Sequence, residues 1–178
     1  RLAELDYTAG RFDAAVHRLD GIMINLKADY ANDALRLQMF LQENVTDAPD
    51  ALRRFAHAEF LARQGKNTEA ITLFLDLVQA FPSAPLVDDA LMAAAMLQAK
   101  AGLFTEAIAS LEKLLTQFKE SSVALDRAQF RLAEVHQYGM HNAPTAIAAY
   151  EKLLAEHPSS LLSVQARKRI RQLRGDAF

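Results

Sequence analysis

Histidine is the first residue type in this chain that could do chemistry, because a neutral imidazole binds metal ions and exchanges protons near neutral pH. The five histidines are His17, His57, His136, His141 and His157. No two lie four residues apart, the spacing that places two ligands on one helical face, and no His-Glu-x-x-His motif occurs. His136 and His141 lie near Glu134, but exposed or packed histidines are far commoner than metal ligands. We expect no metal site.

Motifs for nucleophilic and phosphate chemistry are also missing from the sequence. There is no Gly-x-Ser-x-Gly motif, the glycines are isolated, and the chain has no cysteine. The pair Asp88-Asp89 opens a predicted helix, where the helix dipole favours negative charge without any catalytic role. The sequence therefore predicts a protein that is not an enzyme, with no catalytic residue and no cofactor.

A basic cluster near the end of the chain is the remaining charged feature. Arg167, Lys168, Arg171 and Arg174 lie on one predicted helix, whose apolar stripe is formed by other positions. Such a cluster could contact anionic lipid or an acidic partner, or it could be a solvated face that the helix dipole favours. The whole chain has a formal net charge of −2, which argues against nucleic-acid binding, and it has no apolar run long enough for a membrane span.

The composition indicates helices. Apolar residues make up 51% of the chain, aromatic residues only 8%, and alanine and leucine dominate. Alanine and leucine lose little rotamer freedom in a helix, whereas β-branched residues lose more.

A repeated pattern shows how these helices are arranged. Four glycines, at spacings of 55, 37 and 37 residues, each precede an alanine followed by isoleucine or valine, with a large apolar residue four positions after the alanine. The glycines are Gly10, Gly65, Gly102 and Gly139, and the alanines are Ala15, Ala70, Ala107 and Ala146. Each glycine can end one helix in the left-handed conformation, and each small alanine lets the next helix pack closely. Asp13, Asn67 and Thr105 are expected to cap the second helices.

The second helices carry a family resemblance. Ala70, Phe74 and Pro82, and likewise Ala146, Tyr150 and Pro158, follow an alanine, bulky residue and proline order that resembles the tetratricopeptide repeat. The resemblance implies an all-α, right-handed α-α superhelix of antiparallel hairpins with about ten helices. The linkers that begin at Phe81 and His157 look like those of bacterial cell-envelope proteins of this family. Periplasm, or the periplasmic face of the outer membrane, is therefore the expected location, with the cytoplasm as the alternative.

One solenoid domain is expected over residues 1–178. Its predicted hairpins cover 1–26, 49–80, 85–118 and 122–156, and a capping helix covers 160–174. An extra helix over 31–43 breaks the period, either as a degenerate first helix or as a cap that changes the superhelix.

The first helices of such arrays line a concave groove, so aligned positions in them predict a binding surface. The nine predicted partner-binding residues are Phe55, Glu59, Arg63, Met92, Met96, Lys100, Phe130, Glu134 and Tyr138. An apolar column beside charged columns could hold a peptide, with apolar side chains supplying affinity and charges setting register. The alternative is that these residues pack within or between hairpins.

The function expected from the repeats is a scaffold that binds a protein or peptide partner. Because the first residue is Arg1, we expect the chain to be a segment of a longer protein. The alternative is an accessory segment of a larger enzyme or complex whose active domain lies elsewhere.

Overall fold

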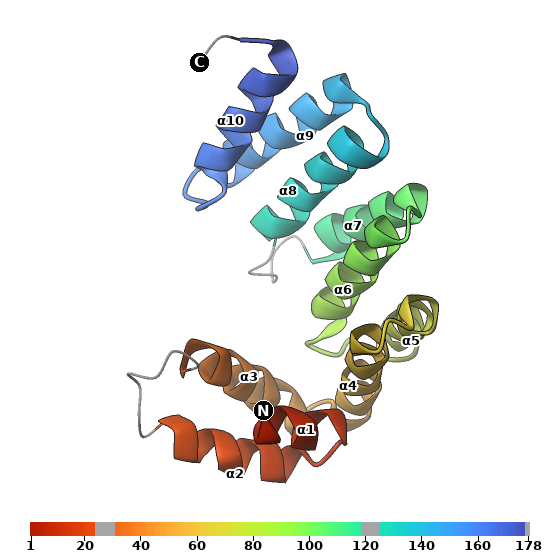
Figure 1. Ribbon diagram of the computed structural model, residues 1–178, viewed down its shortest axis with the longest axis vertical. Coiled ribbons are helices and arrows are strands. Elements are labelled where there is room, and N and C mark those ends of the chain that lie inside the picture. Colours follow the sequence, from red (N-terminus) through yellow and green to blue (C-terminus); the bar gives the residue numbers. More distant parts are fainter. Residues whose placement is uncertain (24–30, 119–124, 177–178) are drawn as a thin grey trace. The chain divides into compact units, whose positions relative to one another are not determined.

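The computed structural model describes residues 1–23, 31–118 and 125–176. These residues form ten α-helices and one π-helical segment, and none of them lies in a strand (Figure 1). The predicted all-α fold and its number of helices are therefore confirmed. The chain divides into two compact units, unit 1 over Arg1–Ala90 and unit 2 over Leu91–Phe178.

Unit 1 contains two helical hairpins and a fifth helix between them in the sequence. Its helices are α1 (Leu2–Thr8), α2 (Phe12–Met23), α3 (Ala31–Val45), α4 (Pro49–Arg63) and α5 (Asn67–Ala80). Helices α1 and α2 pack together, as do α4 and α5, while α3 packs against α2 and contacts α4. Figure 1 shows the two hairpins in red and in yellow to olive. The last residues of the predicted hairpin 1–26 lie outside the described residues.

A chain of aromatic rings joins all five helices of unit 1. Tyr7 of α1 lies 6.1 Å from Phe12 of α2 and 6.4 Å from Phe40 of α3, measured between ring centroids. Phe40 lies 5.2 Å from Phe55 of α4, which lies 5.1 Å from Phe74 of α5. Tilted and edge-on contacts of this kind add about 0.5–1.5 kcal/mol each beyond the area that they bury. The extra helix α3 is thus part of the core of unit 1.

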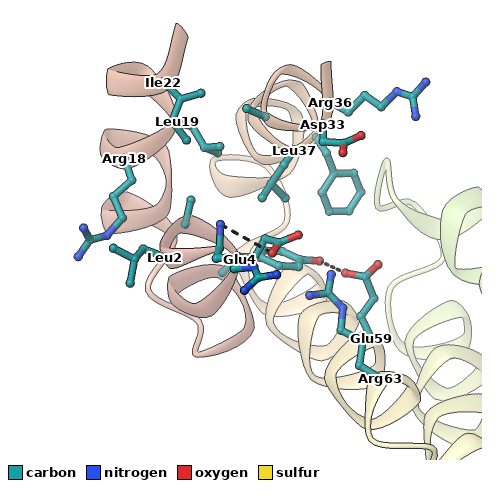
Figure 2. A pocket seen from close by; sticks show the side chains of 15 residues that line it. Leu2, Glu4, Arg18, Leu19, Ile22, Asp33, Arg36, Leu37, Glu59 and Arg63 are labelled. Atoms are coloured by element: carbon teal, nitrogen blue, oxygen red, sulfur yellow. Dashed lines mark hydrogen bonds and ion pairs between the residues drawn. The ribbon is translucent and has the colours of Figure 1, made fainter. Parts of the chain in front are cut away.

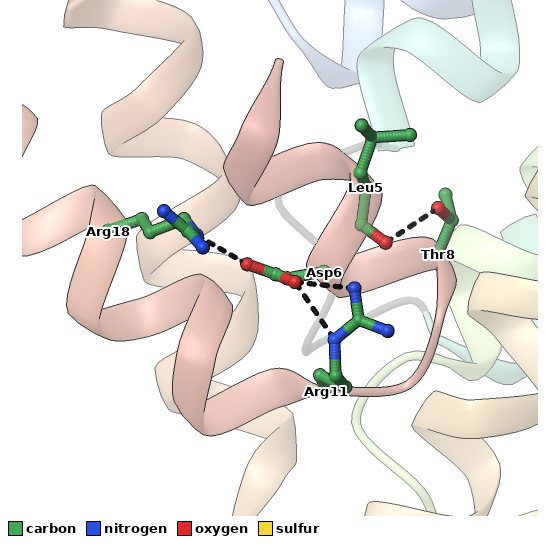
Figure 3. A network of polar contacts seen from close by, with 5 residues as sticks. All are labelled: Leu5, Asp6, Thr8, Arg11 and Arg18. Atoms are coloured by element: carbon green, nitrogen blue, oxygen red, sulfur yellow. Dashed lines mark hydrogen bonds and ion pairs between the residues drawn. The ribbon is translucent and has the colours of Figure 1, made fainter.

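An ion-pair network fixes the α1–α2 hairpin (Figure 3). Arg11, in the turn, donates to Asp6 Oδ1 through Nε at 2.9 Å and Nη2 at 2.6 Å. Arg18 of α2 donates from Nε to Asp6 Oδ2 at 2.5 Å. Asp6 is only 5% exposed, so the two guanidinium groups provide the partners that a buried carboxylate requires. Their hydrogen bonds, that of Arg18 first, hold the pKa of Asp6 below its ordinary value.

Unit 2 continues the hairpin pattern. Most of α6 (Val87–Lys100) lies in it, followed by α7 (Phe104–Gln117), α8 (Leu125–Glu134), the π-helical segment η1 (Val135–Gly139), α9 (Ala143–Glu156) and α10 (Ser163–Arg174). Helix α8 packs against α7 and α9, and α10 packs against α9. Residues 122–124 of the predicted hairpin 122–156 lie outside the described residues, and the predicted helix 160–174 begins at Ser163.

The core of unit 2 is held by apolar packing and a few buried hydrogen bonds. The rings of Phe130 in α8 and Tyr150 in α9 lie 5.3 Å apart at their centroids, and Ala166 and Ile170 of α10 pack onto the same cluster. The buried hydroxyl of Ser110 donates to Gln98 Oε1 at 2.8 Å and joins α7 to α6. This bond satisfies two polar groups that would otherwise be costly to bury.

Three of the four repeat glycines end helices as predicted. Gly10, Gly65 and Gly102 have φ values of +72°, +79° and +79°, in the left-handed region. The prediction for Gly139 is wrong, because it ends a π-helical segment and the left-handed residue is His141, with φ of 50°. A Cβ at Gly139 would lie 2.4 Å from Phe104 Cδ1, so glycine is required here because the Phe104 ring leaves no space for a side chain. The wider π turn falls where the sequence holds extra residues before Ala146.

The predicted caps at Asp13, Asn67 and Thr105 are also wrong. Helices α2, α5 and α7 begin at Phe12, Asn67 and Phe104, so the three residues already lie inside the first turn. A side-chain cap is found at Asn142, whose Oδ1 accepts a hydrogen bond from Thr145 N at 3.2 Å.

Candidate protein-binding groove

A groove with a volume of about 1080 Å³ opens between the helices of unit 1. Figure 2 shows side chains from α1, α2, α3 and α4 around it. Its apolar wall includes Leu2 of α1, Leu19 and Ile22 of α2, and Leu37 and Phe40 of α3. Leu2 is 63% exposed, and Leu37 and Phe40 are half-buried. Apolar surface is therefore available to a partner.

The floor of the groove holds a hydrogen-bonded pair from distant parts of the chain. The Tyr7 hydroxyl donates to Glu59 Oε2 at 2.8 Å, joining α1 to α4. Tyr7 is 1% exposed and Glu59 is half-buried. Burial raises the pKa of Glu59 despite the hydrogen bond from Tyr7, and burial together with the Glu59 charge raises the pKa of the Tyr7 phenol. Tyr7 therefore stays protonated and acts as the donor.

Charged side chains surround this floor with both signs. Arg63 lies one turn after Glu59 on α4, and Asp33 and Arg36 extend from α3 (Figure 2). Arg18 also lines the groove, but its guanidinium is bound to Asp6. An exposed ion pair contributes about 0–1 kcal/mol, whereas full burial of a leucine-sized side chain contributes about 1.5–3 kcal/mol. The apolar wall can thus supply affinity, and the charges can select orientation.

Three of the predicted partner-binding residues lie in unit 1. Glu59 and Arg63 line the groove together. Phe55 is 6% exposed and packs between Phe40 and Phe74, so its side chain supports the groove from the core.

The other six predicted residues lie in unit 2. Phe130 is 3% exposed against Tyr150, and Met92 is half-buried. Met96 is 39% exposed, and Lys100 of the same helix is exposed. Glu134 forms an ion pair with Arg131, and the exposed ring of Tyr138 lies under the Arg169 guanidinium, 5.4 Å from the ring centroid. The role of all nine residues in binding a partner stays a prediction.

Sequence reasoning missed the residues that α1, α2 and α3 bring to the groove. Tyr7, Leu37 and Phe40 were outside the aligned first helices from which the surface was predicted. The apolar spacing of Ala34, Leu37 and Leu41 gives α3 a face that could have indicated packing against other helices. No local signal links Tyr7 to Glu59, because they lie 52 residues apart.

The described residues contain no group of three His, Cys, Asp or Glu side chains placed to hold a metal ion. Among the described helices, none is long and apolar enough to cross a membrane.

Comparison with known protein families shows which kind of repeat the chain contains. Sequence profiles of the tetratricopeptide repeat match residues 55–124 and residues 127–160, which together cover more than half of the chain. The chain belongs to the tetratricopeptide-repeat family. The matched segments begin within α4 and end before α10, so most residues that line the groove of unit 1 come from helices that precede the first match. Tetratricopeptide repeats are scaffolds for protein interactions, and the hairpins within residues 55–124 and 127–160 are repeats of that kind.

Solved structures agree on the fold. Two crystal structures of a protein from Podosopora anserina, described as a kinesin light chain with nearly identical tetratricopeptide-like repeats, are similar to this chain, and one of them is a point variant. In both, the TM-score is 0.61 at 16% sequence identity, over 98% of this chain and 84% of the other. At this identity the likeness concerns the fold alone. No protein among the curated sequences matches the chain.

Proposed function

We propose that this chain is a non-enzymatic scaffold, and that the groove of unit 1 holds a segment of a protein partner. The observation that carries the proposal is the groove itself, in which Leu2, Leu37 and Phe40 offer apolar surface beside charged groups of both signs. Ligand pockets for small molecules have volumes of about 300–1,000 Å³. The groove, with a volume of about 1080 Å³, is slightly larger than this range and has room for several side chains of a peptide.

A matched pair of substitutions on α3 tests this proposal. Leu37 lines the groove, whereas Leu35 lies on the same helix, is 40% exposed and does not line it. Leu37→Asp is expected to weaken capture of protein partners from extracts of the source cells, and Leu35→Asp is expected to leave the same proteins bound. Circular dichroism of both variants controls for folding. Equal capture by the two variants would show that the groove does not bind the partner.

We also propose that the chain works in a bacterial cell envelope, as part of a larger protein. The support is the resemblance of the linkers at Phe81-Pro82-Ser83 and His157-Pro158-Ser159 to those of envelope proteins of the family. Fractionation of the source cells tests the location, since recovery of the protein with the cytoplasm would contradict it. If the groove captured another domain of the same polypeptide, the alternative role as an accessory segment of a larger enzyme or complex would be favoured.

A further inference from the structure

The outer face of α10 carries positively charged side chains that take no part in the packing of unit 2. Arg167, Lys168 and Arg171 are exposed and lie on one face of the helix, because they are spaced three and four residues apart. Val164, one turn before them, is 75% exposed, and Leu161, in the preceding turn, is 97% exposed. We refer to these five residues as the α10 stripe.

The opposite face of α10 is the one that folding requires. Ser163, Ala166 and Ile170 are buried, and Leu173 packs against the core cluster of unit 2. The two remaining basic residues have partners, since Arg174 pairs with Glu151 at 2.5 Å and Arg169 lies over Tyr138. Within the described part of the chain, no carboxylate lies within ion-pair distance of the three basic residues in the stripe.

This arrangement costs stability in the isolated chain. Arg167 and Arg171 are four residues apart, and Lys168 and Arg171 are three apart, so their like charges repel across one helical turn. The helix dipole favours basic residues only in the last turn, which covers Arg171 and Arg174 but neither Arg167 nor Lys168. No acidic residue of α10 offsets them, because its sequence is SVQARKRIRQLR. A bound partner with negative charge would remove the repulsion.

We propose that the α10 stripe binds an acidic segment of a protein partner, with an apolar side chain of that segment against Leu161 and Val164. Unit 2 as a whole favours such a partner, because it holds eleven Lys and Arg against eight Asp and Glu. A lipid surface fits less well. A helix that binds a membrane inserts its apolar face, and the apolar face of α10 is already buried in the core. The stripe shares no residue with the groove of unit 1, so either proposal can fail without the other.

The test uses the full chain and a fluorescein-labelled peptide of five Glu-Glu-Leu repeats, with binding followed by fluorescence anisotropy. The triple variant Arg167→Glu, Lys168→Glu and Arg171→Glu is expected to bind about tenfold more weakly, the combined effect of three exposed ion pairs. A control triple, Lys113→Glu, Arg127→Glu and Lys152→Glu, changes the net charge equally at other exposed positions of unit 2 and is expected to retain most of the affinity. Circular dichroism confirms that both variants fold.

The apolar half of the stripe separates this proposal from unspecific charge attraction. A peptide of five Glu-Glu-Ser repeats is expected to bind several-fold more weakly than the leucine peptide, and Leu161→Ser with Val164→Ser is expected to remove that difference. Equal binding of the two peptides, or equal losses in the two triple variants, would overturn the proposal. So would vesicles containing phosphatidylserine that bind the stripe while the leucine peptide does not. Dimerisation through the stripe, detected by sedimentation, would identify a second copy as the occupant and would overturn it as well.

Discussion

At the scale of single residues, the burial of Glu59 makes the stability of the fold sensitive to pH. Burial raises the pKa of Glu59, so the folded state binds a proton more tightly than the unfolded state does. The contribution of Glu59 to stability therefore falls as the pH rises through its folded-state pKa. Glu59→Gln keeps an acceptor for the Tyr7 hydroxyl but cannot ionise.

We therefore expect Glu59→Gln to have a higher urea midpoint than the wild type at pH 8. The difference should shrink toward pH 4, where the wild-type carboxyl is mostly protonated in both states. Urea unfolding of both proteins across this range measures the effect. A difference that stays constant with pH would show that the charge on Glu59 does not destabilise the fold.

Asp6 predicts the opposite pH dependence. Hydrogen bonds from Arg18 and Arg11 lower its pKa in the folded state, so its contribution is present above the unfolded-state pKa and is lost as the pH falls through the folded-state pKa. Asp6→Asn is expected to lower the unfolding midpoint at pH 7 and to lose this effect in acid. The control is Asp76→Asn, at an exposed aspartate of α5. An equal response of both variants at every pH would contradict the role given to the Asp6 network.

At the scale of elements, the π-helical segment makes Gly139 a packing position. An alanine there would place its Cβ 2.4 Å from Phe104 Cδ1, so we expect Gly139→Ala to lower the free energy of unfolding by about 1–3 kcal/mol. In a Phe104→Leu background most of this loss should disappear, because the two positions share one contact. Gly21→Ala is the control, since Gly21 lies within α2 with open space around it and alanine favours helices. Additive effects of Gly139→Ala and Phe104→Leu would contradict the close approach.

The helices could be predicted from the sequence because their signals are local. The spacing of alanine and a bulky residue, as in Ala70 and Phe74, marks the packed face of each second helix, and three of the four repeat glycines end a helix as expected. The turn at Gly139 could not be predicted, because a π turn depends on how η1 packs against α7 and α9. The start of α10 at Ser163, three residues later than predicted, has a related reason. In the preceding turn, Ser160 Oγ donates to Asp126 Oδ2 at 2.5 Å and accepts a hydrogen bond from Leu162 N at 3.1 Å.

At the scale of the whole molecule, the chain consists of two compact units that offer different surfaces. Unit 1 provides the groove, and unit 2 provides the α10 stripe. The repeat alignment of α4 placed Glu59 and Arg63 among the predicted partner-binding residues, and both line the groove of unit 1, while their role in binding stays a prediction. It could not predict the wall formed by Leu37 and Phe40, because α3 lies outside the repeat pattern and only the folded chain brings it to α1 and α4.

The most direct test of the groove as a partner-binding site is photo-crosslinking in the source cells. Benzoylphenylalanine replaces Leu37 in the groove, and in separate proteins it replaces Leu35 or Glu69, which do not line it. We predict a crosslink to a protein partner at position 37 and little or none at positions 35 and 69. Crosslinks of equal yield at all three positions, or crosslinks confined to positions 35 and 69, would contradict the claim.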